Sequence, residues 1–216
     1  MSNILITGTT SGLGSSLLKT YSERGHNVRS LNRKDCDFRK LDQVEKAVNN
    51  QIETDEYKYV FLNAGILGQL TPVSQISLYD YQEAFNINVW SNKIIIDKLI
   101  KNSKVKNVVC ISSGAASKGY YGWSLYCSTK AAMKQLMSCY AIENPEVNFL
   151  SLAPGLVKTK MQDEIHQYDE KDVPSVKKFK EAYETMQTPD ECAKKIYENL
   201  DLILEQKQNF FDLRNL

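Results

Sequence analysis

The sequence predicts a single α/β domain in which a doubly wound parallel sheet lies between two layers of helices. Three observations support this fold class. Short apolar segments alternate with amphipathic segments of helical period along the chain, as parallel strands and their helical crossovers do. The 216 residues, 42% of them hydrophobic, are enough for one sizeable core and few for two. Polar and glycine-containing motifs follow the apolar segments, at the strand ends where such sheets bind ligands.

Net charge, apolar content and cysteine count indicate which partners and which cellular location to expect. The formal net charge is +1 and the lysines are spread along helical segments, so we expect neither nucleic acid nor a membrane surface as a partner. No apolar segment approaches the roughly 20 residues that span a bilayer. Strand-like sequence begins at Asn3, so we expect no signal peptide and a cytoplasmic protein. Five cysteines without a CxxC pair and two distant histidines predict reduced thiols and no metal site.

The first strand and helix enclose a glycine-rich turn. Asn3–Thr7 is apolar, the glycines of residues 8–14 follow it directly, and apolar residues then recur at helical spacing as far as Gly25. Backbone N–H groups at a helix N-terminus can bind a pyrophosphate closely where side chains are absent. On its own such a turn is weak evidence, because a plain tight turn explains it equally well.

The second strand, residues 27–32, ends in Arg33 and Lys34. An acidic residue at this strand end would hold the ribose hydroxyls of NAD(H), whereas a basic one accommodates the 2′-phosphate of NADP(H). We therefore expect NADP(H) rather than NAD(H), with a solvated surface arginine as the alternative. Asp37 and Phe38 follow too soon for a parallel crossover of a dozen or more residues, which predicts a third strand that is vestigial or continuous with the second.

The later elements continue the alternation. Asn86, Asn88 and Asn92 interrupt one long helix, which predicts a kink or an inserted water there. Residues 160–187 are charged, and we expect them to form helical pieces that act as a mobile lid over the substrate. The predicted strands are residues 57–62, 106–111, 147–152 and 209–213, and the predicted helices are residues 41–52, 78–100, 125–142 and 189–206.

A serine, a tyrosine and a lysine follow the strand at 106–111. Ser113 stands at the strand end, Tyr126 thirteen residues later and Lys130 four residues beyond it. Positions i and i+4 share a helix face, so the phenol and the ammonium can meet. One unit charge at about 4 Å and an effective dielectric of about 20 favours a phenolate by about 4 kcal/mol. The pair is suited to transfer protons, although a lone YxxxK pair is more often two surface residues.

Two further motifs complete the set, NAG at Asn63 and PGxVxT at Pro154–Thr159. Together with TGxxxGxG at Thr7–Gly14, the helix asparagine Asn88, Ser113 and YxxxK at Tyr126, they resemble the short-chain dehydrogenase/reductase family, in its single-domain branch. The resemblance covers nearly the whole chain and implies a Rossmann-type, three-layer α/β/α fold, with residues 1–216 as one dinucleotide-binding catalytic domain. The sequence departs from the family pattern in having no room for the crossover helix between the second and third strands, so we expect a compact form. The resemblance also implies a homodimer or homotetramer.

The resemblance implies NADP(H)-dependent hydride transfer between nicotinamide and a ketone, aldehyde or secondary alcohol. Tyr126 would be the general acid in reduction and the general base in oxidation, and Ser113 would hold the substrate oxygen. Lys130 would assist Tyr126 and bind the nicotinamide ribose, while Asn88 would support a water that links Lys130 to solvent. The expected cofactor contacts are Gly8, Ser11, Gly12, Leu13, Gly14, Arg33, Asp37, Phe38, Asn63, Ala64, Gly65, Tyr126, Lys130, Pro154, Gly155, Val157 and Thr159.

Ala115, Tyr120, Trp123 and Met161 are the expected substrate lining. Plain packing is an equal alternative for the aromatic residues of this set; if they line the pocket, the substrate is apolar or aromatic. Two other functions stay open at this point. One is an NADP(H)-binding sensor or scaffold, in which the Tyr126 phenol would have no role. The other is a sugar-nucleotide epimerase or dehydratase, whose glycine spacing differs and whose substrate domain has no counterpart in this sequence.

Overall fold

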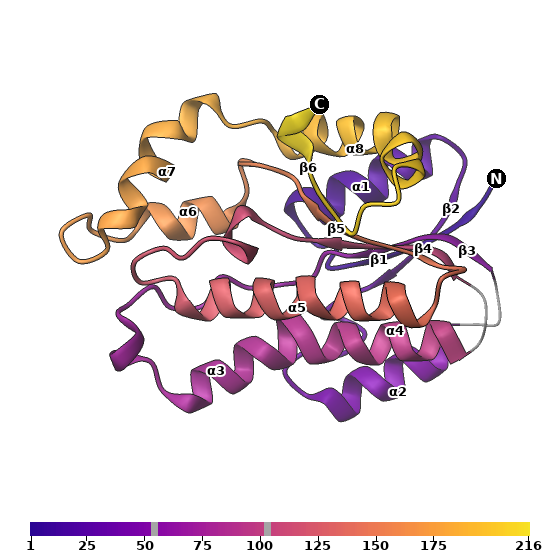
Figure 1. Cartoon of the computed structure of the whole chain (residues 1–216), viewed down its shortest axis with the longest axis horizontal. Coiled ribbons are helices and arrows are strands. Elements are labelled where there is room, and N and C mark those ends of the chain that lie inside the picture. The colour runs from indigo at the N-terminus through magenta and orange to yellow at the C-terminus, as the bar shows by residue number, and fades with distance from the viewer. Residues whose placement is uncertain (53–55, 102–104) are drawn as a thin grey trace.

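The computed structural model describes residues 1–52, 56–101 and 105–216. Six parallel strands form one sheet in the order β2-β1-β3-β4-β5-β6 (Figure 1). Because the order reverses between β1 and β3, the sheet winds outward in both directions from this boundary, which is where doubly wound sheets bind ligands. The predicted single-domain α/β fold is confirmed, and each strand lies within one residue of its expected bounds. The strands are β1 (Asn3–Thr7), β2 (Asn27–Leu31), β3 (Tyr57–Leu62), β4 (Val105–Ile111), β5 (Asn148–Ala153) and β6 (Phe210–Asp212).

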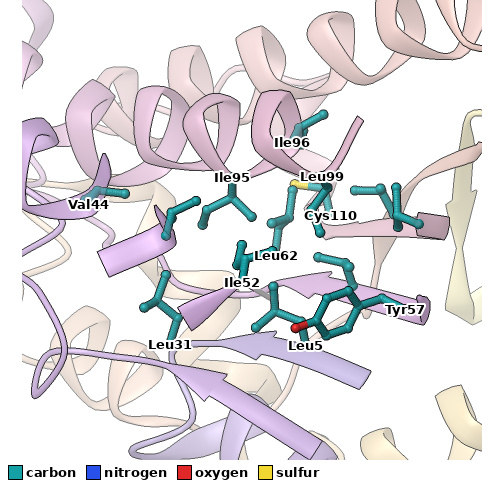
Figure 2. Packing of buried hydrophobic residues seen from close by; sticks show 14 of the residues in the cluster. Leu5, Leu31, Val44, Ile52, Tyr57, Leu62, Ile95, Ile96, Leu99 and Cys110 are labelled. Atoms are coloured by element: carbon teal, nitrogen blue, oxygen red, sulfur yellow. The ribbon is translucent and has the colours of Figure 1, made fainter. Parts of the chain in front are cut away.

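Helices cover both faces of the sheet. α1 (Gly12–Glu23) and α8 (Pro189–Glu205) pack on one face, and α2 (Leu41–Gln51), α4 (Ser91–Lys101) and α5 (Ser124–Glu143) on the other (Figure 1). Successive strand residues point to opposite faces, so Leu5 belongs to the cluster under α4 while Ile6 belongs to the cluster under α1. Figure 2 shows the first cluster, where Leu5 and Leu62 of the sheet lie beneath Ile95 of α4.

In place of the vestigial third strand expected after β2, residues 32–40 form turns. This segment contains neither helix nor strand, so β2 is an edge of the described sheet and α2 is the crossover from β2 to β3. Cys36 and Phe38 are buried in the cluster that also contains Val44 of α2. Burial of these two side chains therefore holds the short segment against the core without strand pairing.

The helix expected over residues 78–100 is continuous but changes its winding in the middle. α3 (Leu78–Phe85) leads into one turn of π-helix, η2 (Asn86–Trp90), and then into α4. Ser77 caps the start of α3 through a capping box with Asp80. The interruption that the asparagines predict is thus a π-turn, a feature that is frequent at functional sites.

Residues 160–187 fold as short helices: α6 (Lys160–His166), η4 (Pro174–Val176), α7 (Lys177–Ala182) and η5 (Tyr183–Thr185). They bury apolar side chains of their own, among them Ile165, Val176 and Phe179, against Leu67 and Trp123. Although the segment is rich in charged residues, its apolar side chains therefore form a small buried cluster next to the main core. The remaining single turns are η1 (Val73–Gln75), η3 (Gly114–Ala116) and η6 (Leu213–Asn215). None of the helices in the described residues has the length and apolarity that a bilayer crossing requires.

Candidate active site

A cavity of about 530 Å³ opens beyond the carboxyl ends of β1, β3, β4 and β5. It gathers segments that are far apart in the sequence, since the ends of parallel strands meet at one sheet edge. Four of the residues expected at the site, Gly14, Asp37, Asn88 and Ala115, are not among those that line the cavity. The expected residues that do line it are Gly8, Ser11, Gly12, Leu13, Arg33, Phe38, Asn63, Ala64, Gly65, Ser113, Tyr120, Trp123, Tyr126, Lys130, Pro154, Gly155, Val157, Thr159 and Met161.

The turn after β1 is fastened to the loop after β3. Asn63 Nδ2 donates hydrogen bonds to the carbonyl oxygens of Thr7 and Gly8, each at 3.0 Å. A Cβ on Gly8, whose φ is +70°, would lie 2.8 Å from the Cα of Ala64, and a Cβ on Gly14 would overlap the carbonyl oxygen of Gly8. Both glycines are thus required by close backbone packing, and Gly14 supports the turn from outside the cavity.

The start of α1 has the properties of an anion site. Ser11 is the N-cap residue but makes no side-chain hydrogen bond to the helix, and the first turn contains no acidic residue. The N–H groups of this turn are therefore left for a ligand, at the end of the helix where the dipole favours negative charge. Ser11, Gly12 and Leu13 line the cavity together with Arg33 from the end of β2. These residues fit the pyrophosphate and adenosine side of a dinucleotide.

Asp37 and Phe38 lie differently with respect to the cavity. Phe38 lines it and is almost fully buried. The Asp37 carboxylate instead accepts hydrogen bonds from the Arg39 guanidinium, with Nη2 at 2.7 Å from Oδ2. These hydrogen bonds from Arg39 hold the pKa of the Asp37 carboxyl at about 2. The Asp37 carboxylate is therefore paired with Arg39. Of the two expected adenine contacts, Asp37 and Phe38, only Phe38 lines the cavity.

Ser113, Tyr126 and Lys130 form one wall of the cavity. β4 ends just before Ser113, and the first two turns of α5 carry Tyr126 and Lys130 on one face, both more than nine-tenths buried. Lys130 Nζ lies 5.5 Å from the centroid of the Tyr126 ring and donates a hydrogen bond of 2.8 Å to the carbonyl oxygen of Ile111. A hydroxyl, a phenol and an ammonium thus line the same space.

Asn88 lies behind this wall and holds the loop after β3. Its Oδ1 accepts a hydrogen bond from the Ile66 N–H, and its Nδ2 donates to the Ile66 carbonyl oxygen, both at 2.9 Å. A Cβ on Gly65 would lie 3.2 Å from Asn88 Oδ1 and 3.8 Å from Lys130 Nζ. Asn92 Nδ2 donates to the Asn88 carbonyl oxygen at 2.9 Å. The π-turn therefore presents Asn88 to Ile66, and the Asn88 amide and the Lys130 ammonium both lie close to Gly65.

Aromatic rings line the cavity next to Tyr126, whose ring packs edge-on against that of Trp123. Trp123 and Phe179 are stacked, with centroids 4.6 Å apart and planes inclined by 22°, and Tyr120 lies beside both. Phe179 comes from α7, so residues 160–187 contribute directly to the lining. Ala115 is buried in the apolar cluster beneath these rings rather than exposed to the cavity.

Several buried polar atoms at the cavity have no hydrogen-bond partner within the described ranges. They are Oγ of Ser112, Nε1 of Trp123 and Oε1 of Gln162, and all three residues line the cavity. Buried polar groups without partners are costly, so their concentration here fits a site that binds a polar ligand.

Sequence reasoning missed some of the lining, most clearly Phe179, Gln162 and Arg214. Arg214 follows the last strand, and the only available signal was that every strand of a parallel sheet ends at the same edge. Phe179 and Gln162 lie in residues 160–187, where the sequence gives helical pieces but not the face that each piece turns inward. Cys127, next to Tyr126, does not line the cavity, and its burial raises the pKa of its thiol.

Known proteins resemble this chain in sequence and in fold. The profile of the family described as short chain dehydrogenase matches residues 34–170. A benzil reductase ((S)-benzoin forming) from Bacillus subtilis (strain 168) is 30% identical over 213 residues, covering 86% of this chain and 88% of that protein. A 4-hydroxyisoleucine dehydrogenase complexed with NADH has a TM-score of 0.82 at 18% identity, covering 98% of this chain and 96% of that chain. The closed form of a serine dehydrogenase complexed with NADP+ has a TM-score of 0.72 at 17% identity, covering 97% and 93%.

Proposed function

Because the chain belongs to the short-chain dehydrogenase/reductase family of oxidoreductases, we propose that it is an NADP(H)-dependent carbonyl reductase. It transfers a hydride between nicotinamide and a ketone, an aldehyde or the corresponding secondary alcohol. The observation that carries this proposal is a single cavity that combines the uncapped start of α1, Arg33 and the wall of Ser113, Tyr126 and Lys130. A nucleotide site and a proton-transfer group thus share one space.

Ser113, Tyr126 and Lys130 have different roles in the proposed carbonyl reduction. When bound, NADPH supplies the hydride that adds to the carbonyl carbon. The Tyr126 hydroxyl donates the proton to the carbonyl oxygen, and the Ser113 hydroxyl donates a hydrogen bond to the same oxygen as negative charge develops on it. Lys130 stabilises the phenolate left on Tyr126 by Coulomb attraction and holds the nicotinamide ribose. In alcohol oxidation Tyr126 accepts the proton instead.

The support for NADP(H) over NAD(H) comes from the end of β2. The family uses nicotinamide cofactors, and solved structures of this fold hold NADH or NADP+. In this chain the two residues that follow β2 are Asn32 and Arg33, and neither of them is acidic. Arg33 lines the cavity near Ser11 and Gly12, and a guanidinium is well matched to a phosphate.

The aromatic rings support a ketone with an apolar or aromatic substituent. Trp123 and Phe179 are stacked on each other, and the Trp123 ring packs edge-on against the Tyr126 ring, so that an apolar surface lies beside the phenol in the cavity. The relative from Bacillus subtilis is named for the reduction of benzil, a compound with two aromatic rings. We extend that substrate class to this chain, with residues 160–187 as a lid whose Phe179 contacts the substrate.

The test is consumption of NADPH by the wild-type protein with a panel of carbonyl compounds, followed by the absorbance of the reduced nicotinamide. Benzil and other aryl ketones should be reduced to hydroxy compounds in a one-to-one ratio with the NADPH oxidised. Simple aliphatic aldehydes serve as the comparison, because they cannot use the aromatic surface. Tight NADPH binding without turnover of any compound would refute the proposal and favour a non-catalytic sensor or scaffold.

A further inference from the structure

Arg214 reaches the cavity from the last strand of the sheet. β6 pairs with β5 so that Asp212 is aligned with Ala153, and the turn η6 therefore lies beside the loop that starts at Pro154. The Arg214 Cγ is 3.2 Å from the position that a Cβ on Gly155 would take, and its Nη2 is 4.0 Å from that of Gly114. The side chain thus extends from the loop after β5 to the residue that follows Ser113.

The Arg214 guanidinium is held in place by Asp212. Nε donates to Oδ1 at 2.9 Å and Nη2 to Oδ2 at 2.5 Å, and the Arg214 backbone N–H also donates to Oδ1. These hydrogen bonds lower the pKa of the Asp212 carboxyl and raise the pKa of Arg214. Only 16% of the Asp212 side chain is exposed, against 65% for Arg214. Asp212 therefore holds one edge of the guanidinium, formed by Nε and Nη2, while the rest of the group stays exposed at the cavity.

The pairing decides which kind of group the open side can bind. A guanidinium has five N–H donors, and Asp212 uses one on Nε and one on Nη2. The second N–H of Nη2 and both N–H groups of Nη1 are therefore left without a partner in the described part of the chain. Asp212 also offsets the positive charge. A neutral oxygen that accepts a hydrogen bond suits this arrangement better than a carboxylate, which would face the Asp212 charge as well.

A second donor lies at the same place. The Tyr120 hydroxyl is 3.8 Å from the position of a Cβ on Gly114, which Arg214 Nη2 also approaches. The ring of Tyr120 continues the aromatic surface of Trp123 and Phe179. Beside Ser113 the cavity therefore offers two hydrogen-bond donors over Gly114, and apolar rings further along the same wall.

We propose that Arg214 and Tyr120 bind a second oxygen of the substrate, on the carbon next to the reacting carbonyl, and so make the enzyme selective for vicinal dicarbonyl compounds over monoketones. The reacting oxygen occupies Ser113 and Tyr126, the neighbouring oxygen lies over Gly114, and the rings contact the substituents. This inference rests on the proposed reductase function and names the substrate class of the same site.

The experiment compares benzil with deoxybenzoin, which keeps both rings but has one carbonyl. In Arg214→Met we expect kcat/KM for benzil to fall about tenfold or more, as for loss of a hydrogen bond from a charged donor, and kcat/KM for deoxybenzoin to change less than about twofold. Arg24→Met is the matched control, because Arg24 lies over the ring of Tyr197 on α8, away from the cavity. It should leave both substrates unaffected.

If Arg214→Met lowers kcat/KM equally for benzil and deoxybenzoin, the proposed selectivity for dicarbonyl compounds is wrong, because a purely structural role of Arg214 would affect both substrates.

Benzoylformate, which carries a carboxylate beside its ketone, provides the remaining comparison. A larger loss for benzoylformate than for benzil would show a carboxylate site instead. Asp212→Asn should shift preference toward benzoylformate, since it removes the offsetting charge. If the wild type reduces none of these compounds, the reductase function fails; if it reduces benzil and Arg214→Met has no effect, only the dicarbonyl inference fails.

Discussion

At the residue scale, the choice of cofactor depends on Arg33. The side chain lines the cavity near the start of α1, where a 2′-phosphate on the adenosine ribose is expected. We predict that Arg33→Ala weakens NADPH binding about tenfold or more, as for a lost charge-assisted hydrogen bond, and leaves NADH binding nearly unchanged. The measurement is titration of cofactor fluorescence with both dinucleotides.

Lys34→Ala is the control for this prediction, because Lys34 has the same charge one residue later but does not line the cavity. It should affect both cofactors equally and weakly. If Arg33→Ala weakens the binding of NADPH and NADH equally, Arg33 does not contact the 2′-phosphate. The arginine would then attract either dinucleotide through its charge alone.

Spacing within one segment made part of the site predictable. Tyr126 and Lys130 share a helix turn, and Ser113 ends the strand before them, so local periodicity was enough to bring them together. Asp37 shows the limit, because its pairing with Arg39 turns the carboxylate away from the cavity. Arg214 was missed because its position after the last strand indicates only the sheet edge, whereas its contacts with Gly114 and Gly155 arise from sheet register between distant segments.

At the scale of elements, residues 160–187 are the part of the structure whose order should depend on ligand. α6 begins with cavity-lining residues, and α7 contributes Phe179, but both helices are short and rest on a small apolar cluster. Segments with few buried contacts open at low free energy. We predict that NADPH slows amide hydrogen exchange in α6 and α7, with a further decrease when a non-reacting aryl ligand is added.

The matched comparison for this exchange measurement is α8, which is packed on the main core against α1 and should not respond. Unchanged exchange in α6 and α7, together with saturated NADPH binding, would contradict a lid. A uniform decrease over the whole chain would indicate global stabilisation instead, because ligand binding to the folded state raises the free energy of unfolding everywhere.

The elements differ in how far sequence could define them. Apolar strands and capped helices have local signals, such as Thr188, Pro189 and Glu191 at the start of α8. The asparagines predicted an interruption of the long helix, but not a π-turn, because the partner that fixes it is the backbone of Ile66 in another loop. The turns at residues 32–40 replaced an expected strand because buried Phe38 holds the chain without pairing.

At the scale of the whole molecule, we predict a homodimer or homotetramer formed through the layer of α4 and α5. Large apolar side chains are exposed on the elements of this layer or next to it, including Leu78 of α3, Trp90 of η2 and Ile142 of α5. Light scattering on the purified protein should give twice or four times the chain mass of 24.6 kDa. Trp90→Glu should weaken the assembly, and a wild-type monomer at micromolar concentration would contradict this prediction.

The fold as a whole was the most predictable level, because alternation of strands and helices restricts the topology of a parallel sheet. The position of the cavity followed from the polar and glycine-containing motifs at the carboxyl ends of the strands, which line it in the structure. What the pattern could not define is the shape of the substrate side, which depends on how residues 160–187 and η6 pack over the strand ends.

The most direct test of the central claim is the kinetics of Tyr126→Phe with benzil and NADPH. Tyr121→Phe is the control, because Tyr121 lies in the same loop region with its side chain exposed and outside the cavity. Removal of the proton donor should lower kcat/KM by at least about 100-fold while the Kd for NADPH stays nearly the same, and Tyr121→Phe should behave as wild type. Retention of wild-type turnover by Tyr126→Phe would contradict the account.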